Sequence, residues 1–117
     1  MRTNRFQEDS ATGSYDSLVL DVLCDGSAYG YEIVRRIFEQ SRHTILWNRG
    51  TLYRVLHHLE RQRLVTGQWQ GPKRGRQRKY YRLTERGHRV WREQRVAWRA
   101  FSNAVNALLG FSPAKRS

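Results

Sequence analysis

Near residue 64 the spacing of the apolar residues changes from that of helices to that of strands. Before this point, three segments of about ten residues place apolar side chains three and four positions apart, as amphipathic helices do. After it, residues 64–69 and 79–83 have the pattern of strands, and the stretch 71–76 between them is rich in turn-forming residues. A helical pattern then continues over 85–109. The chain is therefore predicted to be mainly α, with a two-stranded β hairpin.

Residues that cap or stop helices indicate the bounds of the three short helices. Ser14 is predicted to cap the first, and residues 25–27 to end it. The second is expected from about Tyr29 to Gln40. Asn48 is a good N-cap for the third, which should end around 61–63. Three short helices followed by a hairpin are typical of a winged helix-turn-helix, whose third helix enters the DNA major groove.

The length and the element order together predict the domain organisation. A chain of 117 residues allows one compact domain with a modest core. We expect a flexible arm over residues 1–13, a winged helix-turn-helix domain over 14–84, a C-terminal dimerisation helix over 85–110 and a tail over 111–117. No apolar stretch approaches the ~20 residues of a membrane span, and no secretory leader begins the chain. A single cysteine excludes a disulfide framework, so the expected location is the cytoplasm.

The charge is concentrated in the second half of the chain. The net charge is +12, but residues 1–60 carry seven basic and eight acidic side chains, whereas residues 61–117 carry fifteen and two. Such asymmetry most often marks a nucleic-acid-binding face. A solvated basic surface is the alternative, because 19 of the 22 basic residues are arginine and the bias could be general.

Two groups of polar side chains are candidates for DNA contacts. The hairpin tip holds five cations without an intervening acid, and such a tip can follow a phosphate backbone or enter a minor groove. The exposed face of the third helix offers donors, acceptors and an aromatic ring to base edges and phosphates. The candidates are Lys73, Arg74, Arg76, Arg78 and Lys79 on the hairpin, and Arg49, Thr51, Tyr53, Arg54 and His57 on the helix.

The long last helix carries an apolar stripe at heptad spacing. A helix of this length has no obvious partner inside a small domain, so a second copy of the chain is the expected partner, although the first helix should cover part of the stripe. Gln94 interrupts the stripe and could set its register. The predicted dimerisation residues are Trp91, Trp98, Phe101, Val105 and Leu108.

Two features of this helix have alternative interpretations. Trp98 is either dimer core or, paired across the dimer axis, one wall of a site for a flat apolar molecule. A second stripe consists of Arg86, Arg89, Arg92, Arg95 and Arg99. These side chains either lie near phosphates or acidic groups of a partner, or are solvated; we interpret most as solvated, with Arg86 and Arg89, nearest the wing, as the candidates for such contacts.

The chain has no recognisable catalytic or metal-binding set. His43, His57, His58 and His88 lack the spacing of metal ligands, and no glycine-rich loop that could hold a phosphate precedes a helix. Cys24 lies on an apolar helix without a nearby base in the sequence, so we expect a packing residue. We therefore expect neither enzyme activity nor a metal or cofactor.

Four segments resemble the PadR family of bacterial transcription regulators, in the family's order and spacing. They are Gly30-Tyr31-Glu32-Ile33, Gly50-Thr51-Leu52-Tyr53, Arg78-Lys79-Tyr80-Tyr81 with Leu83-Thr84-Glu85, and the aromatic pair Trp98 and Phe101. The single C-terminal helix is similar to that of the compact subfamily. The resemblance implies a homodimeric repressor on a palindromic operator, released by a planar aromatic effector bound near Trp98 and Phe101.

The sequence departs from the family pattern at four positions. Tyr29 replaces a frequent His, and Arg54 and Gln77 replace prolines. Arg63 stands where a Gly commonly ends the recognition helix, so that corner is expected to be rebuilt. Two other functions stay open, namely a ligand-sensing or protein-interaction adaptor and a basic architectural nucleic-acid-binding protein.

Overall fold

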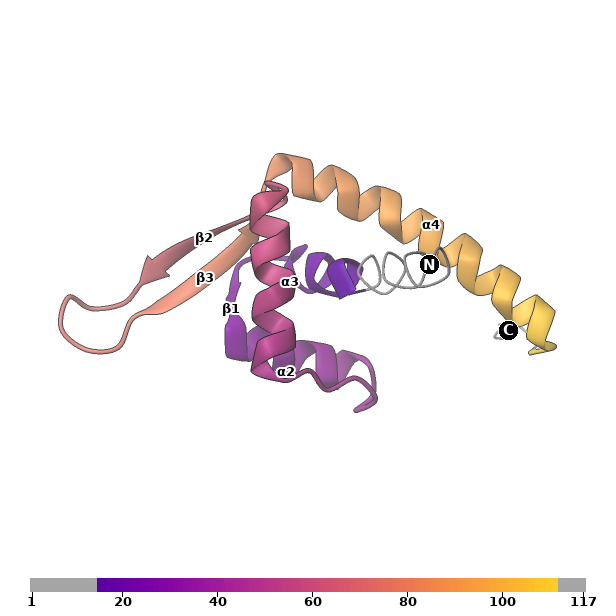
Figure 1. Ribbon diagram of the computed structural model, residues 1–117, viewed down its shortest axis with the longest axis horizontal. Coiled ribbons are helices and arrows are strands. Elements are labelled where there is room, and N and C mark those ends of the chain that lie inside the picture. Colours follow the sequence, from indigo (N-terminus) through magenta and orange to yellow (C-terminus); the bar gives the residue numbers. More distant parts are fainter. Residues whose placement is uncertain (1–14, 112–117) are drawn as a thin grey trace, which may run out of the picture.

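The computed structural model describes residues 15–111, which form a helical cluster with a projecting hairpin and a long C-terminal helix (Figure 1). The described elements are a helix over 15–23, β1 (Ala28–Tyr29), α2 (Gly30–Gln40), α3 (Arg49–Arg61), β2 (Val65–Gln70), β3 (Arg78–Leu83) and α4 (Glu85–Leu109). The predicted mainly α fold with a β wing is confirmed. Ser14, the arm and most of the predicted tail lie outside the described residues.

The sheet has one strand more than the predicted hairpin. Its order is β1-β3-β2, and both pairings are antiparallel. The added strand is only two residues long, and its Ala28 and Tyr29 pair with Tyr81 and Tyr80. Tyr29, expected in the second helix, therefore lies in β1, where its backbone N–H donates to Glu32 Oε1 at 3.2 Å.

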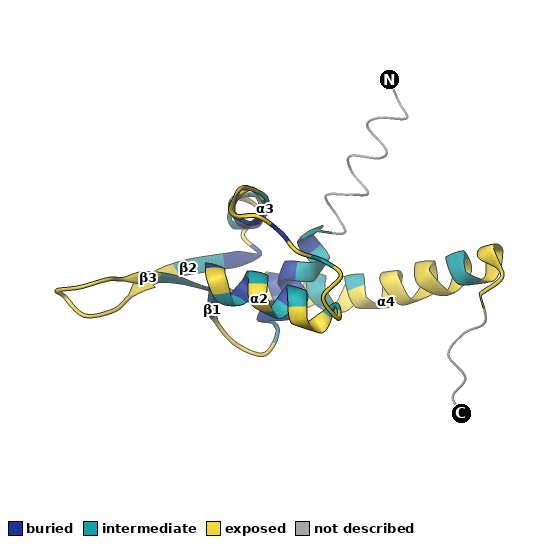
Figure 2. Ribbon diagram, turned by 90° about the horizontal axis from the view of Figure 1, so that it is seen from below, coloured by how far each residue is buried: buried dark blue, intermediate teal, exposed yellow. Residues whose placement is uncertain are grey.

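The core lies where the 15–23 helix, α2, α3 and the base of the sheet meet (Figure 2). The helices contribute the apolar stripes that the sequence predicts, and the sheet contributes mainly Val65, Tyr81 and Leu83. The helical spacing predicts Tyr31 on the apolar stripe of α2, but 68 % of its surface is exposed. The largest fully buried side chains are Val19, Leu20, Leu23, Ile33, Leu56, Leu59 and Tyr81.

The corner after α3 keeps the left-handed backbone that a glycine usually adopts. Arg63 has φ 62°, and its N–H donates to the Glu60 carbonyl at 2.9 Å. The next N–H, of Leu64, reaches back to the Leu59 carbonyl at 2.9 Å, which completes a Schellman cap. The expectation that Arg63 would cause this corner to be rebuilt is wrong, because these hydrogen bonds hold the residue in the left-handed region.

Thr84 joins this corner to the start of α4. Its hydroxyl lies 2.7 Å from the Arg63 carbonyl oxygen and 3.2 Å from that of Leu64, and it accepts the Gly87 N–H at 2.9 Å as the N-cap of α4. The Thr84 N–H also donates to the Leu64 carbonyl at 3.0 Å. The end of α3 and the beginning of α4 are therefore bonded directly to each other.

Most of α4 extends away from the core, and its C-terminal half is largely exposed (Figure 2). Gly87 is its one buried residue, and the helix ends at Gly110, which has φ 81°. Within residues 15–111 no helix combines the length and the apolar character that crossing a bilayer requires.

Candidate nucleic-acid interface

The third helix and the hairpin face each other across a cleft of about 610 Å³. The N-terminal end of α2 forms the third side of this cleft. Six of the ten predicted DNA-binding residues line it, namely Arg49, Tyr53, His57, Arg76, Arg78 and Lys79. The fold thus gathers on one face cations that the sequence places up to 30 positions apart.

The start of α3 is held by its predicted cap. Asn48 Oδ1 accepts the Thr51 N–H at 2.8 Å, so the first turn forms with Arg49 exposed beside the cleft. Arg54 is exposed on the same helix but does not line the cleft, and Thr51 is half-buried outside it.

Tyr53 packs against α2 and also lines the cleft. Its hydroxyl lies so close to Gly30 that a Cβ at that glycine would be 2.6 Å from the oxygen. Its ring centroid lies 6.4 Å from that of His57. Tyr53 therefore fixes α3 against the start of α2 while its ring borders the cleft.

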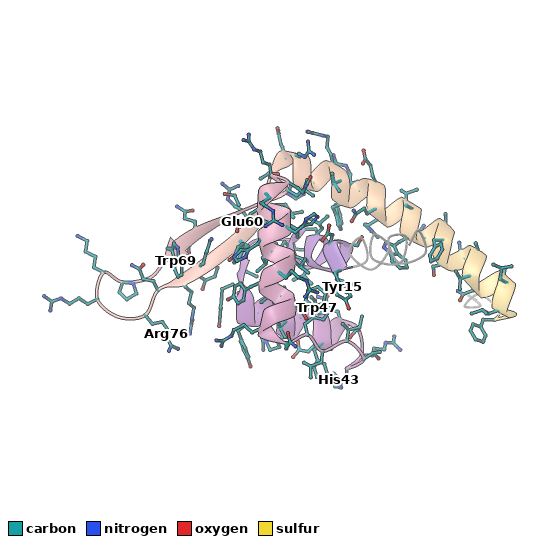
Figure 3. All side chains as sticks on the ribbon, viewed as in Figure 1. Tyr15, His43, Trp47, Glu60, Trp69 and Arg76 are labelled. Atoms are coloured by element: carbon teal, nitrogen blue, oxygen red, sulfur yellow. The ribbon has the colours of Figure 1, made fainter. Side chains whose placement is uncertain are left out.

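The hairpin loop presents its cations to solvent. Residues 71–77 are all exposed, and the chain reverses through Gly71 at φ 143° and Gly75 at φ 113°. Lys73 and Arg74 lie in this loop and do not line the cleft. Arg76, where the loop returns toward β3, does line the cleft (Figure 3).

Arg78 and Lys79 are adjacent in sequence but have different surroundings. Lys79 Nζ lies 3.3 Å from Glu60 Oε2 of α3 and 5.3 Å from the centre of the Tyr81 ring. The guanidinium carbon of Arg78 lies 4.6 Å from the centre of the Tyr29 ring. Both side chains line the cleft, but Lys79 is half-buried and paired with a carboxylate of the domain, whereas Arg78 is exposed.

Besides the buried Trp47 and Tyr81, three aromatic residues that line the cleft were missed as site residues. Tyr29, Tyr31 and Trp69 all line it, and Tyr31 and Trp69 are 68 % and 63 % exposed. The strand pattern of residues 64–69 could have indicated Trp69. Residues two apart in a strand share a face, and Trp69 lies on the same face as Gly67, opposite Lys79 and Tyr81 of β3. No comparable signal existed for Tyr29, because its strand is too short to show a period.

The predicted dimerisation stripe divides into a covered half and an exposed half. The indole N–H of Trp91 donates to Asp21 Oδ1 at 3.0 Å, and Ser17 Oγ donates to Gln94 Oε1 at 2.6 Å, so the 15–23 helix covers the first half. Beyond it, Trp98 is 41 % exposed and contacts Phe101 edge-on at 5.7 Å. Phe101 and Leu108 are 59 % and 85 % exposed, while Val105 is half-buried.

A second cavity, of about 730 Å³, lies beside the covered half of this stripe. Its walls come from the 15–23 helix, from the loop between α2 and α3 and from α4, and they are mostly apolar. Tyr15 and Trp47 lie side by side in one wall, with ring centroids 5.1 Å apart (Figure 3). Trp91 and Trp98 of α4 also line the cavity.

Neither a metal site nor a reactive thiol is found among residues 15–111. Among them, no three His, Cys, Asp or Glu side chains are placed to hold a metal ion. Burial, followed by the charges of Asp25 and Asp21, raises the pKa of the Cys24 thiol above its ordinary value. A raised pKa disfavours the reactive thiolate, in agreement with a packing role.

Three short helices, a wing of antiparallel strands and an exposed, cation-lined third helix define a winged helix-turn-helix DNA-binding protein. The profile of the PadR-like family of transcriptional regulators matches residues 19–93. This match covers more than half of the chain, and the chain belongs to this family.

Solved structures of other regulators have the same fold over nearly the whole chain. A PadR family regulator from Eggerthella lenta is 33 % identical, with 92 % of this chain and 91 % of that chain covered and a TM-score of 0.69. A transcriptional regulator from Clostridium thermocellum is 26 % identical, with 85 % and 93 % covered and a TM-score of 0.74. An uncharacterized protein X of Lysinibacillus sphaericus is 26 % identical over 103 residues, which are 88 % of this chain and 94 % of the relative.

Proposed function

We propose that this regulator is a homodimeric repressor that binds a palindromic operator in the cytoplasm and is released by a planar aromatic effector. It has no catalytic role in this proposal. The observation that carries it is the division of the surface, with a cation-lined cleft on α3 and the wing and an exposed apolar stripe on the far half of α4.

The charge of the cleft supports binding to the DNA backbone. Arg49, Arg76 and Arg78 line it, and the loop cations Lys73 and Arg74 extend the same charge outward. An arginine fork can hold two phosphate oxygens or the edge of a guanine. The exposed α3 side chains then select sequence while the wing supplies affinity.

The exposed end of α4 supports pairing with a second copy. Phe101, Leu108 and Leu109 of α4, and Phe111 just after it, are each at least 59 % exposed, and so many large apolar side chains in one place rarely stay in water. If two α4 helices cross near Trp98, each exposed half meets the covered half of the other. Two recognition helices related by this two-fold axis would read an inverted repeat.

The aromatic cavity beside Trp98 supports control by a small molecule. A volume of about 730 Å³ with Tyr15, Trp47, Trp91 and Trp98 in its walls suits a flat aromatic compound. Such a compound at the dimer seam would change the angle between the two DNA-binding domains and so weaken operator binding.

Selection of bound sequences from random DNA tests the specificity. An enriched inverted repeat is expected, and promoter DNA containing it should be transcribed less when the protein is added. Enrichment of no motif would favour a basic architectural protein and contradict the proposal.

Salt titration on the selected duplex tests the role of the wing. Replacing Arg74 and Arg76 by Gln should lower the slope of log affinity against log salt by roughly 0.9 for each lost phosphate contact. Arg99→Gln, which removes an exposed arginine from α4, is the matched control and should leave the slope unchanged.

Sedimentation tests the dimer. Phe101→Glu should give monomers at micromolar concentration, because it places a charge in the predicted seam. Val96→Glu is the control, since Val96 is 72 % exposed on the opposite side of the helix. A Phe101→Glu protein that remains dimeric would place the interface elsewhere.

A further inference from the structure

A row of tyrosine rings lies beside the cleft. Tyr29 of β1 is the middle ring, with Tyr31 of α2 at 6.5 Å and Tyr80 of β3 at 5.4 Å between centroids. The Tyr31 ring is tilted 28° from the plane of Tyr29, and Tyr80 meets it edge-on at 65°. Tyr29 and Tyr80 are also paired through the backbones of their strands. Neighbours from two other elements therefore hold the half-buried Tyr29 ring in one orientation.

Arg78 stacks on this held ring. Its guanidinium carbon lies 4.6 Å from the centre of the Tyr29 ring. A stacked guanidinium uses its flat face, so its five N–H donors, which lie in the plane of the group, can still bind acceptors. Within residues 15–111, no carboxylate lies within ion-pair distance of Arg78. The stack thus orients the cation without using its donors.

Lys79 shows that this arrangement is particular to Arg78. The Lys79 ammonium is half-buried and lies 3.3 Å from the Glu60 carboxylate, which offsets its charge inside the domain. Arg78, one residue earlier, is exposed and lines the cleft together with Arg49 and Arg76. Of the two adjacent cations of β3, Arg78 is the one available to an external anion.

We propose that Tyr29 is a positioning residue, which holds the Arg78 guanidinium ready to bind the oxygens of one DNA phosphodiester. This inference rests on the proposed function, since Arg78 must face the DNA. An unsupported arginine loses much of its rotamer freedom when it binds, and holding the fork in advance removes part of that cost. Tyr29 then acts on affinity through Arg78, without contacting DNA itself.

The test measures the binding of the full chain to a mixed-sequence duplex of about 24 base pairs by fluorescence anisotropy at several salt concentrations. Arg78→Ala should weaken binding and lower the salt slope by roughly one. Tyr29→Leu, which keeps an apolar side chain but removes the ring, should weaken binding about two- to fivefold with little change of slope. Tyr29→Phe should bind like the natural chain.

A double-mutant cycle separates positioning from a general structural effect. In the Arg78→Ala background, Tyr29→Leu should not weaken DNA binding any further. If Tyr29→Leu instead disturbed the fold, it would weaken binding both with and without Arg78. Arg78→Lys keeps the charge but loses the planar stack, so it should bind several-fold more weakly at an unchanged slope and should also be insensitive to Tyr29→Leu. This second cycle keeps a cation at the exposed position 78, so it does not depend on how well the Tyr29→Leu, Arg78→Ala double variant folds.

The outcomes distinguish a missing DNA contact at Arg78 from a missing positioning role of Tyr29. If Arg78→Ala leaves affinity and slope unchanged, Arg78 does not contact DNA, and this part of the proposed function fails together with the inference. If Arg78→Ala weakens binding but Tyr29→Leu has the same effect with and without Arg78, the positioning role is overturned and the DNA contact stands.

Discussion

Replacing Gly87 by Ala should destabilise the protein, although the same substitution stabilises an ordinary helix. Gly87 lies in the first turn of α4 and packs against the corner after α3. A Cβ built on it would overlap the carbonyl oxygen of Leu64 and lie 3.4 Å from the Leu83 Cβ. That carbonyl accepts the backbone N–H of Thr84 and also lies 3.2 Å from its hydroxyl. The new methyl group can be accommodated only if this bonded corner moves.

The size of the effect follows from three contributions. Forcing a methyl group into a filled space costs about 1–3 kcal/mol. Weakening one hydrogen bond at the Leu64 carbonyl costs about 1 kcal/mol more. Ala is favoured over Gly in a helix by about 1 kcal/mol, which offsets part of this loss. We expect the free energy of unfolding to fall by about 1–3 kcal/mol, or roughly 4–8 °C in Tm for each kcal/mol.

Urea unfolding followed by circular dichroism at one fixed protein concentration measures this change. Gly50→Ala is the matched control, because Gly50 also lies in the first turn of a helix but its Cβ would meet only Asn48 Oδ1, at 3.4 Å. This control should be neutral or more stable by up to about 1 kcal/mol. If Gly87→Ala were as stable as Gly50→Ala, the close contact between α4 and the Leu64 carbonyl would be refuted.

Three further predictions concern single side chains. Arg63→Gly should raise the free energy of unfolding by about 1 kcal/mol, because glycine adopts the left-handed backbone at φ 62° without strain. Arg63→Ala is the control and should leave the urea midpoint unchanged. Equal urea midpoints for the Gly and Ala variants would argue against this backbone conformation. Burial, followed by the charge of Glu60, raises the pKa of Tyr81 to about 12. The folded protein therefore keeps this proton after the unfolded chain has lost it, and stability should fall as the pH rises from about 10 towards 12, a component that Tyr81→Phe should lack in unfolding curves recorded at each pH. The raised pKa of Cys24 predicts slower alkylation by iodoacetamide at pH 8 in the folded protein than in urea, which mass spectrometry can follow; equal rates would contradict a disfavoured thiolate.

The helices were predictable from the sequence because their signals are local. The caps at Asn48 and Thr84 lie within three residues of the amides that they bind, and the predicted end of the long helix at 109 agrees with α4. The strand β1 was not predictable in this way. Its two residues show no period, and their partners Tyr80 and Tyr81 lie more than 50 positions away.

The candidate site was predictable in its charges but not in its geometry. Spacing alone assigned Arg76, Arg78 and Lys79 to one basic tip. The structure keeps all three in one cleft but pairs Lys79 with a carboxylate on α3 that no local pattern connects with it. Tyr31 follows the helical spacing of the α2 core residues, yet it is exposed because it lies in the first turn, where the helix reaches the open cleft.

The hydroxyl of Thr84 has a consequence for how a dimer would measure DNA. Thr84 and Trp98 are 14 residues apart, so along α4 the corner lies about 21 Å from the seam. If two chains pair near Trp98, the bonded corner would make α3 and the first half of α4 rotate together as one rigid body about this residue. A rotation of about 10° at this pivot displaces the corner by roughly 3.5 Å, close to the rise of one base pair. In a pair of such chains, a small rotation at the indole rings would thus change the spacing between the two recognition helices by about the rise of one base pair.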